Sequence, residues 1–126
     1  MKSKVYFTRD ISPENVCRLI EATGKKLGGN VAVKVHSGEL GNQNFLRPEF
    51  WRPAIELVKG TVVECNTAYD GSRDTSETHW KTIDAHGWNP CFKVDLLDGE
   101  GADMQLPIPA GKQIKTDYVG GHLASY

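Results

Sequence analysis

The sequence lacks the signatures of several common functional classes. It has no CxxC motif and no cluster of cysteine and histidine with the spacing of metal ligands, which argues against an iron–sulfur or structural zinc site in this chain. The phosphate-binding pattern GxxxxGK[ST] and the dinucleotide pattern GxGxxG are also missing, so nucleotide binding by those two routes is not expected. No apolar stretch approaches the length that spans a membrane.

Charge of one sign is scarce as well. The net charge is −1, and lysine and arginine are spread along the chain rather than grouped, so no surface for nucleic acid is indicated. The three cysteines, Cys17, Cys65 and Cys91, are odd in number and far apart, which predicts reduced thiols in a cytoplasmic protein. A chain of 126 residues with 39% hydrophobic residues predicts one domain, residues 1–126.

Strand and helix patterns alternate along the first hundred residues. Ser12 and Pro13 predict the start of a helix that ends at Gly28-Gly29, and Pro53 predicts the start of a second helix that Gly60 stops, after a helical turn at Pro48. Asp74 and Glu77 resemble a capping box for a third helix, which would end at Gly87. Apolar runs between these helices predict strands, which cover residues 4–7, 31–35, 61–66 and 91–96.

This alternation predicts an α/β fold. Its mainly parallel sheet would have about four strands joined by right-handed crossover helices. Beyond Asp98 the pattern changes to turn residues, and residues 104–108 with residues 113–115 predict a small carboxy-terminal antiparallel pair.

Two polar turns, residues 36–44 and 64–69, come directly after predicted buried strands. Ligands of open parallel sheets bind in the loops beyond the carboxyl ends of the strands, so the two turns predict one shared pocket. His36 would be a general acid or base in that pocket, unless its ring only ties down the loop. Glu64, a carboxylate in a strand that otherwise reads as buried, must be paired, exposed or functional, and is the second candidate catalytic residue.

Other polar side chains near these turns are candidates for ligand binding. Asparagine most often forms turns by bonding its own backbone, and a loop carboxylate is often simply solvated, so both readings stay open for this set. The ligand-binding candidates are Arg9, Ser37, Glu39, Asn42, Asn44, Asn66, Tyr69 and His122. No metal ligand is predicted: His79 and His86 lie two helical turns apart, roughly 10 Å along the axis, and are expected on a solvated or half-buried helix face.

Four segments carry a resemblance to a known family. They are residues 31–39 (VAVKVHSGE), 41–50 (GNQNFLRPEF), 63–69 (VECNTAY) and 117–124 (DYVGGHLA). In this order they closely resemble the domain-of-unknown-function 362 family, whose members are often labelled uncharacterised Fe–S centre proteins. The resemblance implies an α/β fold and predicts that the chain is the amino-terminal part of a longer family protein. The resemblance implies 4Fe–4S clusters only for longer members, which carry a ferredoxin-like segment with the cysteines that bind them. The matching cysteines are absent here, so no cofactor is expected in this chain.

Two functions follow from these expectations. In the first, the chain is the part of an iron–sulfur-linked redox protein that binds a small polar or anionic molecule, with the cluster on a segment outside this sequence. In the second, it is a stand-alone small-ligand or protein-interaction domain without catalysis. A strand missing from the sheet would expose an edge, through which the chain would form a homodimer.

Overall fold

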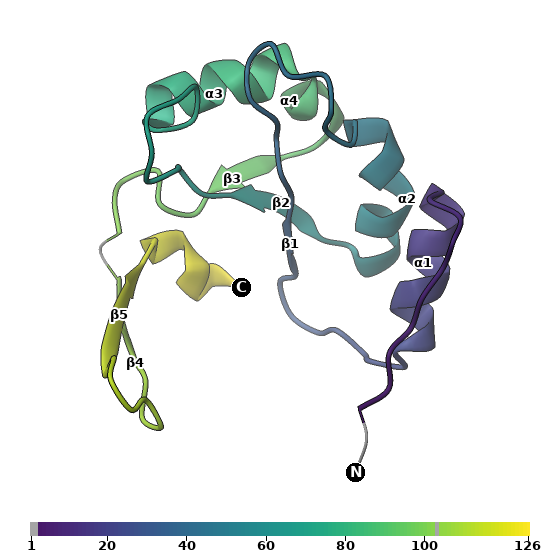
Figure 1. The fold of residues 1–126 in the computed structure, drawn as a ribbon, viewed down its shortest axis with the longest axis horizontal. Coiled ribbons are helices and arrows are strands. Elements are labelled where there is room, and N and C mark those ends of the chain that lie inside the picture. Colours follow the sequence, from purple (N-terminus) through teal and green to yellow (C-terminus); the bar gives the residue numbers. More distant parts are fainter. Residues whose placement is uncertain (1–2, 103) are drawn as a thin grey trace.

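A parallel sheet of three strands organises the computed structural model, which describes residues 3–102 and 104–126. The strands are β1 (Ala32–Lys34), β2 (Thr61–Glu64) and β3 (Val94–Leu96), in the spatial order β1-β2-β3. Both neighbouring pairs are parallel (Figure 1). The predicted α/β class with a mainly parallel sheet is therefore confirmed.

Helices cover one face of this sheet, and the hydrophobic core lies beneath them. Ile55 of α2 (Pro48–Val58), Ile83 of α3 (Ser76–Ala85) and Trp88 of α4 (Trp88–Cys91) pack against side chains of the strands. The other members of this buried core cluster are Val35, directly after β1, with Val62, Val94 and Leu96 of the strands, and Val63 of β2 is buried as well.

The flanks of the sheet are covered differently. The helix α1 (Pro13–Ala22) packs against α2, while the 3-10 helix η1 (Gly121–Ser125) lies on the face of the sheet away from α3 (Figure 1). Among the described residues, no helix is long and apolar enough to cross a membrane.

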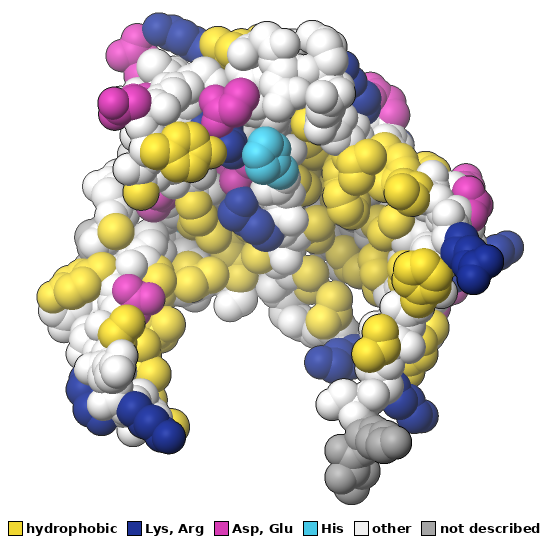
Figure 2. Space-filling view, viewed as in Figure 1, with side chains coloured by type: hydrophobic (Ala, Val, Ile, Leu, Met, Phe, Trp, Pro, Cys, Tyr) yellow, Lys and Arg dark blue, Asp and Glu magenta, His cyan; other side chains and the backbone are white. Residues whose placement is uncertain are grey.

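The predicted carboxy-terminal antiparallel pair is present as a hairpin of β4 (Met104–Pro107) and β5 (Thr116–Val119). The predicted second strand, residues 113–115, is wrong, because these residues belong to the turn and β5 begins at Thr116. The turn is closed by hydrogen bonds from Gly111 N–H to Ile108 O and from Ile108 N–H to Lys115 O. The hairpin projects from the body, and a wide hollow separates it from the amino-terminal segment (Figure 2).

Two predictions for the amino-terminal region are wrong. Residues 4–7 form no strand, so the parallel sheet of the described residues has three strands rather than about four. The helix α1 ends at Ala22 instead of continuing to Gly28-Gly29. The cause is local: Gly24 has a φ of 64° and donates its N–H to Glu21 O, which terminates the helix before the later glycines are reached.

The other boundaries differ by smaller amounts. The helix α2 begins at Pro48 and continues through Pro53, because burial of Ala54 and Ile55 against the sheet favours one continuous helix. The helix α3 is capped by Thr75 with Thr78 instead of by the predicted Asp74 and Glu77. All three parallel strands are shorter than predicted: β1 covers only residues 32–34, β2 ends at Glu64, and β3 begins at Val94 because residues 88–91 form α4.

Substitution of Ile83 by alanine tests the position of the core. Ile83 has no exposed surface, so its loss leaves a cavity, and we expect the free energy of unfolding to fall by about 2–5 kcal/mol. Leu57→Ala is the matched control, because Leu57 is 43% exposed on α2 and should cost much less. Urea denaturation measures both changes, and equal costs would contradict this placement of the helix faces.

Candidate functional site

Glu64 lies at the carboxyl end of the central strand β2 and is 1% exposed. One carboxylate oxygen accepts hydrogen bonds from the backbone N–H of Ser37 (2.8 Å) and from Arg73 Nη1 (3.3 Å). The other accepts from the backbone N–H of Cys65 (3.1 Å) and from Lys34 Nζ. These donors come from the ends of β1 and β2 and from the loop before α3, so Glu64 joins three segments.

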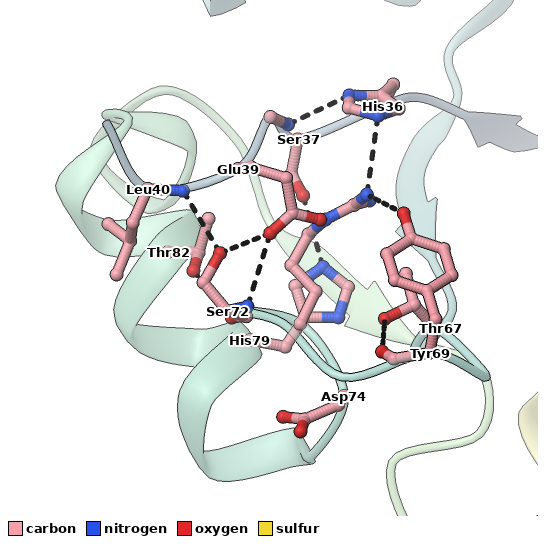
Figure 3. A network of polar contacts seen from close by, with 12 residues as sticks. His36, Ser37, Glu39, Leu40, Thr67, Tyr69, Ser72, Asp74, His79 and Thr82 are labelled. Carbon is pink, nitrogen blue, oxygen red and sulfur yellow. Dashed lines mark hydrogen bonds and ion pairs between the residues drawn. The ribbon is translucent and has the colours of Figure 1, made fainter. Parts of the chain in front are cut away.

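Arg73 is the cation that links this carboxylate to the surface of the site. Its side chain is 4% exposed, and its Nε donates to Glu39 Oε1 at 2.7 Å. Its Nη2 donates to Tyr69 Oη at 3.2 Å and lies 3.3 Å from His36 Nε2. Figure 3 shows His36, Glu39 and Tyr69 close to one another, as their shared contact with Arg73 requires.

The two carboxylates of the network are held in their ionised form. Burial by itself raises the pKa of Glu64, but the hydrogen bonds from Lys34, Ser37 and Cys65 outweigh it and hold the pKa below the ordinary 4.5. Hydrogen bonds from Ser72 and the charge of Arg73 likewise lower the pKa of Glu39, against its partial burial. The network is therefore a compact arrangement of two anions and two cations.

Glu64→Gln tests the contribution of this network to stability. A carboxyl group whose pKa is lowered by folding stabilises the folded state above its unfolded pKa, and the stabilisation is lost as the pH falls through the folded pKa. We expect the variant to be less stable than wild type at pH 7 by about 3–5 kcal/mol, as for a broken buried ion pair. When the pH is lowered below 4.5, the variant should lose less of its unfolding free energy than wild type loses.

The matched control for this change is Glu77→Gln. Glu77 forms an exposed pair with Lys81 at 2.7 Å, which solvent screens, so stability should change little. Urea denaturation at a series of pH values measures both variants. An unchanged acid dependence in Glu64→Gln would show that the network does not couple to folding.

A second chain of hydrogen bonds lies beneath the network. Ser37 Oγ is 3.1 Å from His79 Nε2, and His79 Nδ1 is 3.1 Å from Asn66 Oδ1. Because the Asn66 oxygen can only accept, Nδ1 carries the proton and Nε2 accepts from the serine hydroxyl. This order of groups is that of a nucleophile, a base and an orienting residue. Ser37 is only 1% exposed, however, so in this structure the chain of bonds connects loops and does not present a nucleophile.

The expectation that His79 lies on a solvated or half-buried helix face is wrong, because His79 has no exposed surface. Burial lowers its pKa from the ordinary 6.5, and the nearby cation Arg73 adds to this while Glu64 opposes it. His86, at the end of α3, donates from Nδ1 to Ser37 O at 2.8 Å. Both histidines therefore fix the segment that follows β1.

His79 makes stability depend on pH above the range in which the carboxylates titrate. The unfolded chain takes up a proton near pH 6.5 that the folded state does not, so stability falls as the pH decreases from 6.5 toward the lower folded pKa. We expect His79→Gln to remove this part of the dependence. The unfolding free energies of wild type and His79→Gln at pH 7.5 and 5.5 check this. If the change between the two pH values were the same in both proteins, His79 would not be the source of the dependence.

His36 is exposed and lies at the rim of a groove of about 370 Å³. Asn42, Asn44, Phe45, Leu46 and Trp51 line the groove with it. Its Nδ1 is 3.1 Å from the backbone N of Gly38, and Arg73 faces its Nε2. Both ring nitrogens thus face N–H donors, and in either neutral tautomer only one of them can accept a hydrogen bond.

The turn after β1 depends on glycine at position 38. Gly38 has a φ of 89°, and a Cβ built there would approach Phe45 Cδ1 to 2.8 Å and His86 Nδ1 to 2.9 Å. Phe45 stacks on the His86 ring with centroids 4.2 Å apart. A larger residue would therefore displace both the backbone of the turn and the aromatic pair that supports the groove.

Most of the predicted site residues lie together. His36, Ser37, Glu39, Glu64, Asn66 and Tyr69 belong to the network or to the chain of bonds beneath it, and Asn42 and Asn44 line the groove. Asn42 also forms the local turn, since its Oδ1 accepts from Asn44 N–H at 2.7 Å.

Two candidates lie elsewhere. Arg9 is exposed in the segment before α1, with no hydrogen bond to the network among the described residues. His122 is in η1, where its Nδ1 is 2.7 Å from Asp95 Oδ1. Asp95 also accepts from Tyr126 Oη, so His122 belongs to a separate contact between η1 and β3.

Sequence reasoning missed four residues that make the network. Lys34 is the one charged residue in a short apolar strand, and a charge of opposite sign in the next strand, Glu64, is the signal that could have paired them. Arg73, Ser72 and His79 gave no such signal. Arg73 and His79 have some partners nearby in the sequence, but the contacts of all three with the turn after β1 join residues 32 to 42 positions apart.

The fold and the site define an α/β protein with a polar site at the carboxyl ends of its parallel strands. The family model described as domain of unknown function (DUF362) matches residues 31–126, and the chain belongs to this family. A search of curated proteins and a search of solved structures each gave no match.

Proposed function

We propose that the loops after β1 and β2 bind a small polar or anionic molecule in the groove beside His36. The observation that carries this proposal is the position of His36, an exposed imidazole supported from behind by the buried Arg73. The groove offers the amides of Asn42 and Asn44 as hydrogen-bond partners and the rings of Phe45 and Trp51 as apolar contact. A few polar groups on an apolar lining are typical of small-molecule sites.

In this proposal the network positions the site and His36 meets the ligand. Glu64 is buried and already accepts hydrogen bonds from several donors, so its part is to hold Arg73 and Lys34 in place. His36 is the group that would exchange a proton with a bound molecule. Cys65 is less suited to chemistry, because burial and the charge of Asp98 raise the pKa of its thiol.

An iron–sulfur-linked redox role is the finer form of this proposal and depends on residues outside this sequence. Cys17 is in α1, Cys65 follows β2 and Cys91 ends α4. Within residues 3–102 and 104–126 no group of three or more His, Cys, Asp and Glu side chains could hold a metal ion. The residues present do not fit a cluster, so no step through one is assigned to them.

Ligand binding without catalysis is the second candidate function, and the burial of Ser37 favours it. The only serine with a histidine base beside it in the described site is closed off from solvent. A binding module would use the same groove and the same His36, with no turnover.

Binding can be tested with a planar anion and a small anion as probes. We expect benzoate, and to a lesser degree phosphate, to shift the amide resonances of residues 36–45 in NMR titrations. His36→Ala should weaken benzoate binding at least about tenfold, because it removes a hydrogen-bonding group from the rim.

The control for this experiment is His122→Ala, which removes an imidazole from the separate contact with Asp95 and should leave binding unchanged. Equal affinities of wild type and His36→Ala, or no shift with either probe, would contradict the groove as the binding site.

A further inference from the structure

The strand β1 lies at an edge of the sheet, and no other strand of the described residues pairs with its outer side. Val31 O and Val35 N bond to β2. Because backbone groups alternate sides along a strand, the N–H and C=O groups of Ala32 and Lys34 point to the open edge. Such an edge is a template for pairing with a further strand.

An apolar groove of about 280 Å³ runs along this edge. Residues 31–34 all line it together with residues of α1 and α2, so the groove lies where the edge strand meets these two helices. Ile20 of α1 and Trp51 and Val58 of α2 form its other wall. A strand beside β1 would therefore have an apolar wall against which to bury its side chains.

Residues 4–7 have the pattern of a strand but pair with no strand of the described residues. Val5 and Phe7 alternate with Lys4 and Tyr6, so in an extended chain they point to one side, and they are 88% and 79% exposed. Exposed side chains of this size in an extended segment are typical of an interaction site.

We propose that residues 4–7 of one copy of the chain pair with β1 of a second copy, and that the exchange is reciprocal. A turn directs the segment away from the edge of its own sheet: Asp10 N–H donates to Thr8 Oγ1 at 3.2 Å, and Asn15 Nδ2 donates to Asp10 Oδ2 at 2.7 Å. These bonds anchor the segment to the start of α1 and leave Val5 and Phe7 in solvent. A second copy supplies the missing partner for both the edge and the segment without breaking the turn, in a closed two-fold dimer.

Sedimentation of the full chain over a range of concentrations tests the dimer. We expect the double variant Val5→Lys with Phe7→Lys to raise the dissociation constant of the dimer at least about tenfold, because lysine loses the apolar contact with the groove. Ile114→Lys, in the turn between β4 and β5, is the matched control at a 63% exposed hydrophobic residue and should leave the dimer intact.

Disulfide trapping shows which copy donates the segment. In a background with serine at positions 17, 65 and 91, a chain with Phe7→Cys is mixed with a tagged chain with Leu27→Cys, which lies in the groove. A disulfide between the two different chains supports the exchange. The exchange would be overturned by a monomer at all concentrations or by a dimer that the lysine variants do not weaken. It would also be overturned if Phe7→Cys and Leu27→Cys formed a disulfide only when one chain carried both substitutions.

Discussion

The ion pairs of Glu64 are the interaction on which the site depends. A carboxylate buried at the end of the central strand is unfavourable unless charges and hydrogen bonds compensate it, and here Lys34 and Arg73 supply the charges. The backbone N–H of Ser37 supplies a further bond from the adjoining loop. One side chain thereby fixes the ends of β1 and β2 and the loop that precedes α3.

The remainder of the site follows from this arrangement. If Arg73 moved away from Glu64, a buried charge would be left without a partner, so its other nitrogens stay near Glu39, Tyr69 and His36. His36 is thus an exposed group on a rigid support, which is the property that a binding site needs. The turn at Gly38 determines the shape of the groove beside His36. Phe45 packs against this turn and stacks on the ring of His86.

The two ends of the described chain differ in how they meet the sheet. At the carboxyl end, η1 is tied to β3 through His122 and Tyr126, both bonded to Asp95. At the amino end, residues 4–7 have no such contact, and the edge of β1 stays open. The same sheet therefore carries a polar site at the carboxyl ends of its strands and an apolar groove along one edge.

The sequence by itself determined the α/β class and most of the order of the elements, and it predicted that the polar residues at the ends of the parallel strands lie together. These depend on hydrophobic periodicity, turn residues and the rule that parallel strands end at one edge, all of which are local or topological. It also identified His36 and Glu64, because a polar residue that follows or ends a buried strand is visible in the sequence.

Only the tertiary structure decided which partners these residues have. Arg73 and His79 connect nearby residues to the turn after β1, which is 34 to 42 positions away in the sequence. Whether residues 4–7 become a strand depends on a neighbouring edge, not on their own propensity. Burial and most of the charge pairing are properties of the folded arrangement, and among these pairs only Lys34 with Glu64 leaves a signal in the sequence.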